Sequence, residues 1–175
     1  MLKLCLMAGL LCSFSALADN SASIADVVNQ RLALMKDVAG YKAQQHLPIE
    51  DLAQESKVLA NTQAQAEKLG LEPQSVKPFI VAQMDAAKAI QYRYRADWLA
   101  QPETGWQPQP LEKVRPEIAR LSDKILQQLA QRLRQGPIAE SERQTFIQTI
   151  QQVNLTAADK QRLFDALLMV KLNGQ

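Results

Sequence analysis

Between Ile24 and Lys42 the chain reads IADVVNQRLALMKDVAGYK, and this segment shows most clearly how the protein folds. With about 3.6 residues per helical turn, its apolar side chains fall on one stripe of a helix. Arg31 and Lys42 fall on the same stripe. They are eleven residues apart, so both side chains leave the same side of the helix about 16 Å apart along its axis. Two cations therefore occupy positions where core side chains belong.

A charged side chain that faces a core must be paired, because burying it alone is very costly. The pattern leaves two interpretations of Arg31 and Lys42 open. They could reach the ends of the bundle, or pair with Asp and Glu side chains of a neighbouring helix. Alternatively, they could line a cavity that holds an anion.

Residues 1–18 have the pattern of a secretory signal peptide. Lys3 precedes an apolar run that is too short to span a bilayer, and the small residues that follow predict cleavage before Asp19. Both cysteines, Cys5 and Cys12, lie in this segment, so the mature chain would hold no disulfide and no thiolate metal site. We therefore expect a periplasmic protein that has no contact with the membrane after cleavage.

The composition favours an all-α protein. Residues 19–175 suffice for one domain with a real core, glycine is scarce with 6 residues, and helix-forming residues dominate. The formal net charge of +2 argues against a general nucleic-acid binder or a binder of anionic membranes. Any strongly positive region must therefore be local.

Helical periodicity and helix breakers together predict a single-domain bundle of about six helices. Three long helices fill the core region 19–100, and a proline-rich linker at 101–110 carries Trp106, which we expect to pack on the bundle. The segment 111–175 supplies further helices that complete the same domain and its site. The helices are expected at about 20–45, 48–69, 73–99, 111–135, 140–153 and 157–172.

Several polar residues share the apolar sides of these helices. Gln83, Ala87 and Gln91 interrupt the stripe of the third helix, where the amides would bond either to other helices or to a ligand. Asp51 and Glu55 lie on one side of the second helix, although Asp51 needs no explanation beyond the helix dipole. We find no glycine-rich phosphate loop, metal-ligand cluster or nucleophile–histidine pair, so we expect no cofactor and no metal.

Three segments taken together resemble the secreted, gamma-class members of the all-α (AroQ-type) chorismate mutases. They are RLALMKDVAGYK (31–42), LPIED (47–51) and VAQMDAAKAIQ (81–91). The resemblance is strong over residues 24–100, and from residue 111 onward it rests on helical layout. It favours the cation-lined cavity over paired surface charges.

The resemblance implies an isomerase that rearranges chorismate to prephenate, a one-step pericyclic reaction of phenylalanine and tyrosine biosynthesis. It also implies a homodimer whose ligand is this small dicarboxylate. Arg31 would bind one substrate carboxylate with a two-pronged guanidinium that lysine cannot reproduce. Lys42 and Gln91 would donate hydrogen bonds to the ether oxygen, where negative charge accumulates in the transition state.

The resemblance assigns the remaining site residues as well. Glu55, helped by Asp51, would bind the ring hydroxyl, and Lys124 from the C-terminal half would bind the other carboxylate. Three positions depart from the family pattern. Gln54 and Lys124 stand where relatives have arginine, and Ala87 stands where others have serine or threonine, so only its backbone could contribute.

A second hypothesis is a non-enzymatic periplasmic helical bundle that binds small anions or partner helices. In that case Arg31 and Lys42 would be neutralised by Asp51 and Glu55. The enzyme hypothesis instead expects the cations and Gln91 to converge on one closed pocket.

Overall fold

A computed structural model describes residues 23–174, and this part of the chain is helical without any β-strand, as predicted. The signal peptide expected over residues 1–18 lies outside the described residues. If α1 and α2 count as one interrupted helix, there are six α-helices in the described range, together with a short 3₁₀ turn at Glu140–Glu142. The helices are α1 (Ile24–Ala33), α2 (Met35–Gln44), α3 (Leu52–Lys68), α4 (Pro73–Ala100), α5 (Leu111–Arg134), α6 (Arg143–Thr149) and α7 (Ala157–Leu168).

α1 and α2 form the single rod expected near the N-terminus, with one residue, Leu34, between them. The rod begins at Ile24, later than predicted, because Ser23 and Asp26 form a reciprocal capping box there. Val38 N–H still donates to Leu34 C=O at 3.2 Å, so the backbone ladder crosses the break. The rod therefore carries Arg31 and Lys42 on one continuous face.

α2 ends in a tight turn that shapes the site. His46 has a φ of 53°, a left-handed conformation in which glycine is the usual residue. This conformation turns the chain back, so that Leu47 N–H donates to Lys42 C=O at 2.8 Å. Ile49 is buried beyond the turn, and the loop is held close to the end of α2.

α3 begins at Leu52 and not at Pro48, so the prediction for this helix start was wrong. Asp51 is the N-cap, and its side chain accepts a hydrogen bond from Gln54 N–H at 3.0 Å. Residues 48–50 stay outside the helix because Ile49 is drawn into the core. As a result Glu55 is the acidic residue of the first helical turn.

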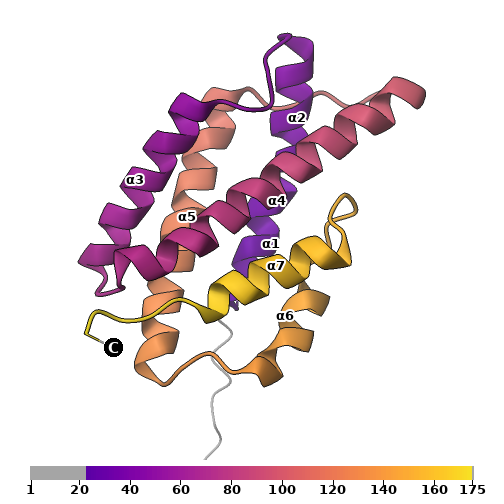
Figure 1. Ribbon diagram of the computed structural model, residues 1–175. Coiled ribbons are helices and arrows are strands. Elements are labelled where there is room, and N and C mark those ends of the chain that lie inside the picture. The colour runs from indigo at the N-terminus through magenta and orange to yellow at the C-terminus, as the bar shows by residue number, and fades with distance from the viewer. Residues whose placement is uncertain (1–22, 175) are drawn as a thin grey trace, which may run out of the picture.

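α4 is the central support of the bundle, and its bounds match the prediction closely. It contacts α2, α3 and α7 along its length of 28 residues. Figure 1 shows it crossing the molecule, with α3 and α5 on the side where it begins and α6 and α7 in the lower part of the view. Apolar side chains from all these helices form one core. No helix among residues 23–174 combines the length and apolar character that a membrane span requires.

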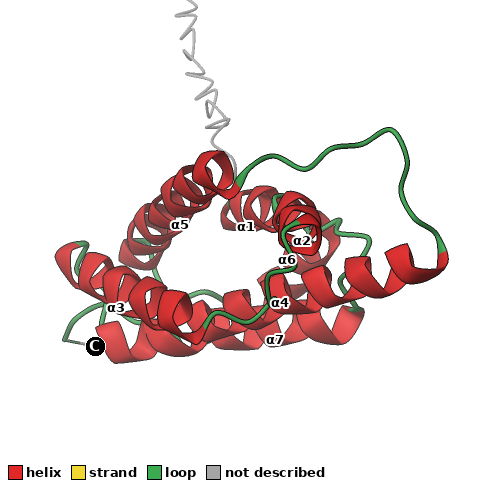
Figure 2. Cartoon of the chain, turned by 90° about the horizontal axis from the view of Figure 1, so that it is seen from above, coloured by secondary structure: helices red, strands yellow, loops and turns green. Residues whose placement is uncertain are grey.

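The segment 101–110 is a long loop from the far end of α4 to α5 (Figure 2). Trp106 packs back on the bundle as predicted, against Gly40 of α2, where an added Cβ would lie only 2.6 Å from the indole. The Lys36 ammonium lies 4.6 Å from the Trp106 ring centroid. Gln109 N–H donates to Asp37 Oδ1 at 3.1 Å. The loop is thus fastened to α2 and sets where α5 begins.

Candidate active site

A cavity of about 320 Å³ lies between the α1–α2 rod, α3, α4 and α5, a size suited to a small molecule. Six of the seven predicted site residues line it, namely Arg31, Lys42, Asp51, Glu55, Ala87 and Gln91. The seventh, Lys124, is half-buried on α5 and is not among the residues that line the cavity. The same helix contributes Arg115 and Ser122 instead.

Arg31 is buried with only 6% of its surface exposed. Its Nε donates to Ser122 Oγ at 3.0 Å, whereas its Nη1 is buried without a hydrogen-bond partner. Burial lowers the pKa of this guanidinium to about 10, so it is still charged at neutral pH. Within residues 23–174 no carboxylate forms an ion pair with it. A buried guanidinium with a free donor is prepared for an anion.

Lys42, with 8% of its surface exposed, lies in the last turn of α2. Its ammonium donates to Ile49 C=O at 2.6 Å, across the turn at His46. Burial lowers the pKa of Lys42, and this effect outweighs the opposing attraction of Asp51. In the described part of the chain it too has no carboxylate within ion-pair distance. Its remaining N–H groups are available to a ligand in the cavity.

Gln91 of α4 is buried with 5% exposed, and its amide faces the cavity that Arg31 and Lys42 line. Its Nε2 donates to Ala87 C=O at 3.1 Å and to the weak acceptor Met35 Sδ at 3.7 Å. The bond to Ala87 fixes which end of the amide is the donor, because a carbonyl accepts and cannot donate. Oε1 is buried without a partner. A ligand can therefore donate a hydrogen bond to Oε1, and it can also take the N–H that is directed at Met35 Sδ, because a thioether sulfur is a weak acceptor.

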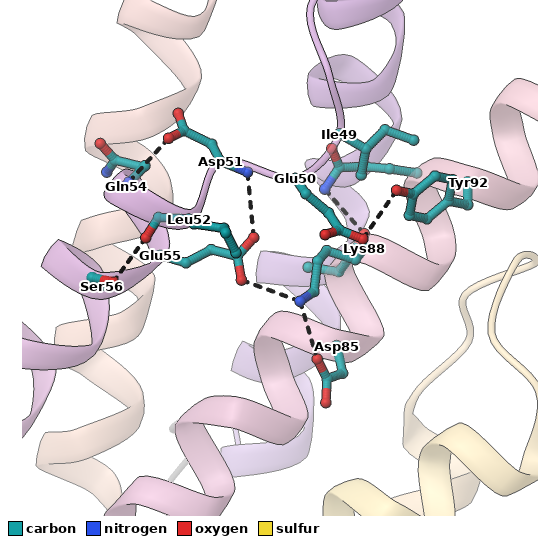
Figure 3. A network of polar contacts seen from close by, with 12 residues as sticks. Ile49, Glu50, Asp51, Leu52, Gln54, Glu55, Ser56, Asp85, Lys88 and Tyr92 are labelled. Carbon is teal, nitrogen blue, oxygen red and sulfur yellow. Dashed lines mark hydrogen bonds and ion pairs between the residues drawn. The ribbon is translucent and has the colours of Figure 1, made fainter.

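The predicted acidic residues of the site, Asp51 and Glu55, lie beside cations other than Arg31 and Lys42, and Figure 3 shows the pair of Glu55 with Lys88. Glu55 Oε1 accepts from Asp51 N–H at 3.4 Å, and Glu55 Oε2 accepts from Lys88 Nζ at 3.1 Å. Asp51 Oδ2 lies 3.9 Å from Arg115 Nη2. These pairs leave the charges of Arg31 and Lys42 uncompensated by Asp51 and Glu55 at ion-pair distance.

Sequence reasoning missed Arg115, Ser122 and Lys88, all of which line the cavity. A signal for the first two exists, because they are seven residues apart and share one face of α5 with the cavity-lining Ile118. The partnership of Lys88 with Glu55 joins two helices, and periodicity within either helix does not reveal it.

Comparisons with known proteins agree with the geometry of this cavity. Residues 18–92 match the family described as Chorismate mutase type II. The chain is also 53% identical over 171 residues to the secreted chorismate mutase of Yersinia pestis, covering 97% of this chain and 92% of that protein. The chain belongs to the type II chorismate mutase family. Chorismate mutases are isomerases, and this protein is an enzyme of that class.

Two further comparisons extend the chorismate mutase likeness. The monofunctional chorismate mutase of Enterobacter agglomerans is 40% identical over 149 residues, which is 85% of this chain and 82% of that protein. The crystal structure of the secreted chorismate mutase from Yersinia pestis superposes with a TM-score of 0.81 at 56% identity, covering 86% of this chain and 97% of that one. The fold of the Yersinia pestis protein is therefore shared over most of this chain.

Proposed function

We propose that the protein converts chorismate to prephenate in the cavity between the α1–α2 rod, α3, α4 and α5. One observation carries the proposal: Arg31 and Lys42 are both buried, line the same cavity, and have no carboxylate ion pair within residues 23–174. Chorismate bears two carboxylates and an ether oxygen that gains negative charge as its C–O bond breaks. A cavity with uncompensated buried cations matches that charge distribution.

Lys42 and Gln91 supply the electrostatic part of catalysis. The Lys42 ammonium and the Gln91 Nε2 N–H that is directed at Met35 Sδ donate to the ether oxygen, and both groups are already held by protein contacts to Ile49 and Ala87. Fixed donors in a water-poor site stabilise developing charge more than water does, by about 3–4 kcal/mol for one strong donor. The reaction needs neither a nucleophile nor a proton transfer, which suits the residues present.

The two carboxylates select the reactive conformer of the substrate. Arg31 binds one of them through Nη1, the group that has no protein partner. For the other we propose Arg115 in place of Lys124, since Arg115 lines the cavity and Lys124 does not. At 3.9 Å its ion pair with Asp51 is loose, so Arg115 is free to turn to a ligand. Gripping both ends brings the reacting atoms together before the chemical step.

Glu55 accepts the hydrogen bond of the ring hydroxyl. Asp51 acts indirectly, since it caps α3 and donates its N–H to Glu55. Ala87 lines the cavity, and its carbonyl orients Gln91. Gln54 also lines the cavity as a neutral side chain.

The alternative, a non-enzymatic bundle that binds anions, is not favoured. It requires Arg31 and Lys42 to be paired with Asp51 and Glu55. Asp51 instead lies near Arg115, and Glu55 pairs with Lys88.

We further propose that the enzyme works in the periplasm as a homodimer, after removal of residues 1–18. The Yersinia pestis relative is named a secreted chorismate mutase, which supports export. The dimer rests on family resemblance and is tested by the mass of the purified protein in solution.

The deciding experiment follows the absorbance of chorismate after addition of purified residues 19–175. We expect rapid loss of the chorismate signal, which Arg31→Met and Lys42→Ala each abolish or strongly reduce. Lys57→Ala, which removes an exposed lysine of α3, is the matched control and keeps full activity. A wild-type protein that leaves chorismate at its spontaneous rate of decay contradicts the proposal.

A further inference from the structure

We propose that Lys88 is a positioning residue that fixes the Glu55 carboxylate on the cavity wall and keeps it away from the buried cations. The inference rests on the proposed function, and it adds a residue that neither the sequence pattern nor the family resemblance singles out. Lys88 lies on α4, directly after Ala87, and lines the cavity itself.

Both carboxylate oxygens of Glu55 accept hydrogen bonds (Figure 3). The N–H of Asp51 holds Oε1, and the Lys88 ammonium holds Oε2 at 3.1 Å. Asp85, one turn earlier on α4, holds the same ammonium at 3.3 Å. Partial burial opposes the charged form of Lys88, but the hydrogen bonds to Glu55 and Asp85 prevail and raise its pKa. The ammonium is therefore charged and anchored from two helices.

This grip matters because Glu55 is a carboxylate in a cavity that must accept a dicarboxylate. Glu55 interacts electrostatically with Lys42, the cation assigned to the ether oxygen. Without Lys88, the attraction between Glu55 and Lys42 would act on an unpartnered carboxylate, and part of the positive charge needed by the substrate would be cancelled. An unpartnered Glu55 would also repel the substrate carboxylates. Lys88 thus keeps the Glu55 carboxylate on the cavity wall, apart from the buried cations Arg31 and Lys42.

Measurements of stability and of substrate binding can distinguish this role from that of a purely structural ion pair between Lys88 and Glu55. About a quarter of each side chain is exposed, 26% for Lys88 and 23% for Glu55, and pairs this exposed contribute little to stability. Loss of the pair should therefore change substrate binding more than folding. Because Glu55 contacts the substrate before and during the reaction, its displacement should raise KM and leave kcat nearly unchanged.

The first test compares chorismate kinetics and thermal unfolding of Lys88→Met and Lys88→Arg with the wild type. Lys88→Met should raise KM by about tenfold, with kcat within about twofold and an unchanged Tm, and Lys88→Arg should restore most of the loss. Lys77→Met removes an exposed lysine from the same helix and is the matched control, with unchanged kinetics. If Lys88→Met behaves like Lys77→Met, or lowers kcat together with Tm, the positioning role is wrong.

The second test asks whether Lys88 acts through Glu55. In a Glu55→Gln background there is no carboxylate left to hold, so adding Lys88→Met should change KM by less than about twofold. An undiminished effect of Lys88→Met in that background overturns the proposal. Lys88→Gln is measured in parallel and keeps the cycle interpretable should the methionine variant fold poorly. Failure of the proposed function is distinct from both results, since the wild type and Lys77→Met would then leave chorismate unchanged.

Discussion

Arg31 of α1 donates from Nε to Oγ of Ser122 on α5, across 3.0 Å and 91 positions of sequence. The Ser122 hydroxyl donates its own hydrogen to Ile118 C=O at 2.8 Å, so its oxygen is turned to accept from Arg31. This contact fixes the guanidinium plane while Nη1 keeps no protein partner. The C-terminal half of the chain therefore orients a cation supplied by the first helix.

Replacing Arg31 should stabilise the fold and abolish the activity. The charge is buried without an ion pair, so Arg31→Met is expected to raise the free energy of unfolding by about 1–3 kcal/mol while abolishing turnover. The pKa of about 10 lies below the ordinary value of an arginine side chain, so the unfolded state binds more protons at pH values between the two. The charged form therefore destabilises the fold at neutral pH, and the wild type should gain stability from this group as pH rises through that window. Denaturant unfolding and chorismate kinetics check both effects. A less stable Arg31→Met protein would show that the charge is compensated in the fold.

Lys42→Ala should lose catalysis and keep the fold. Removing one strong donor at the developing charge costs about 3–4 kcal/mol, or roughly 10²–10³-fold in kcat. Circular dichroism should be unchanged, because within residues 23–174 the hydrogen bond to Ile49 C=O is the one bond of the ammonium that is lost. Lys57→Ala serves as the control for loss of a lysine. A kcat within about threefold of the wild type would remove Lys42 from the assigned role.

Gln91→Glu should restrict activity to acidic pH. An amide donates a hydrogen bond at any pH, whereas a carboxyl group donates only when it is protonated. The wild type is expected to be similarly active at about pH 5 and about pH 8, and the variant only near the lower value. Initial rates across this range provide the measurement. Equal activity of the variant at both ends would contradict a donor role for Gln91.

Asp159 ties α7 to α4, and its loss should be costly at neutral pH. The carboxylate is 4% exposed and pairs with Arg93 at 2.6 Å. Burial alone would raise the pKa of Asp159, but hydrogen bonds from Arg93, Thr156 and Arg162 lower it well below the ordinary 3.8. Asp159→Asn is expected to lower the free energy of unfolding by roughly 1.5–3 kcal/mol.

The pH dependence of that effect follows from the lowered pKa. The stabilisation is complete above the unfolded-state pKa and is lost progressively as pH falls toward the folded one, so the difference between the two proteins should begin to shrink below about pH 4. Asp165→Asn is the control, because Asp165 pairs with Arg143 on the surface and is 61% exposed. Denaturant titrations at neutral and acidic pH make the comparison. A constant difference between wild type and Asp159→Asn at all pH values would refute the linkage.

Periodicity predicted the helices and placed Arg31 and Lys42 on an apolar stripe, because a stripe of side chains on one helix is a local property. It left their burial open, and the family resemblance favoured the buried arrangement that the structure has. The bounds of α4 followed from Pro73 and the proline-rich loop beyond residue 100. The start of α3 could not be predicted this way, since tertiary burial of Ile49 overrides the preference of Pro48 for a first turn.

The site was predicted less completely than the fold. Family resemblance placed six residues on one cavity but chose Lys124 on α5, where the cavity is lined by Arg115. Which face of α5 meets the cavity depends on where the loop 101–110 lets that helix begin. Ion pairs between helices, such as Lys88 with Glu55, depend on three-dimensional packing and leave no mark in the spacing of either segment.

The two tryptophans of the chain are Trp98 and Trp106, and their ring centroids lie 5.8 Å apart. Neither is among the residues that line the cavity. Intrinsic fluorescence of this enzyme is therefore a gauge of the loop fastened to α2. Tryptophan emission should change when the loop 101–110 detaches from α2. It should not change when a ligand occupies the cavity and the walls of the cavity do not move.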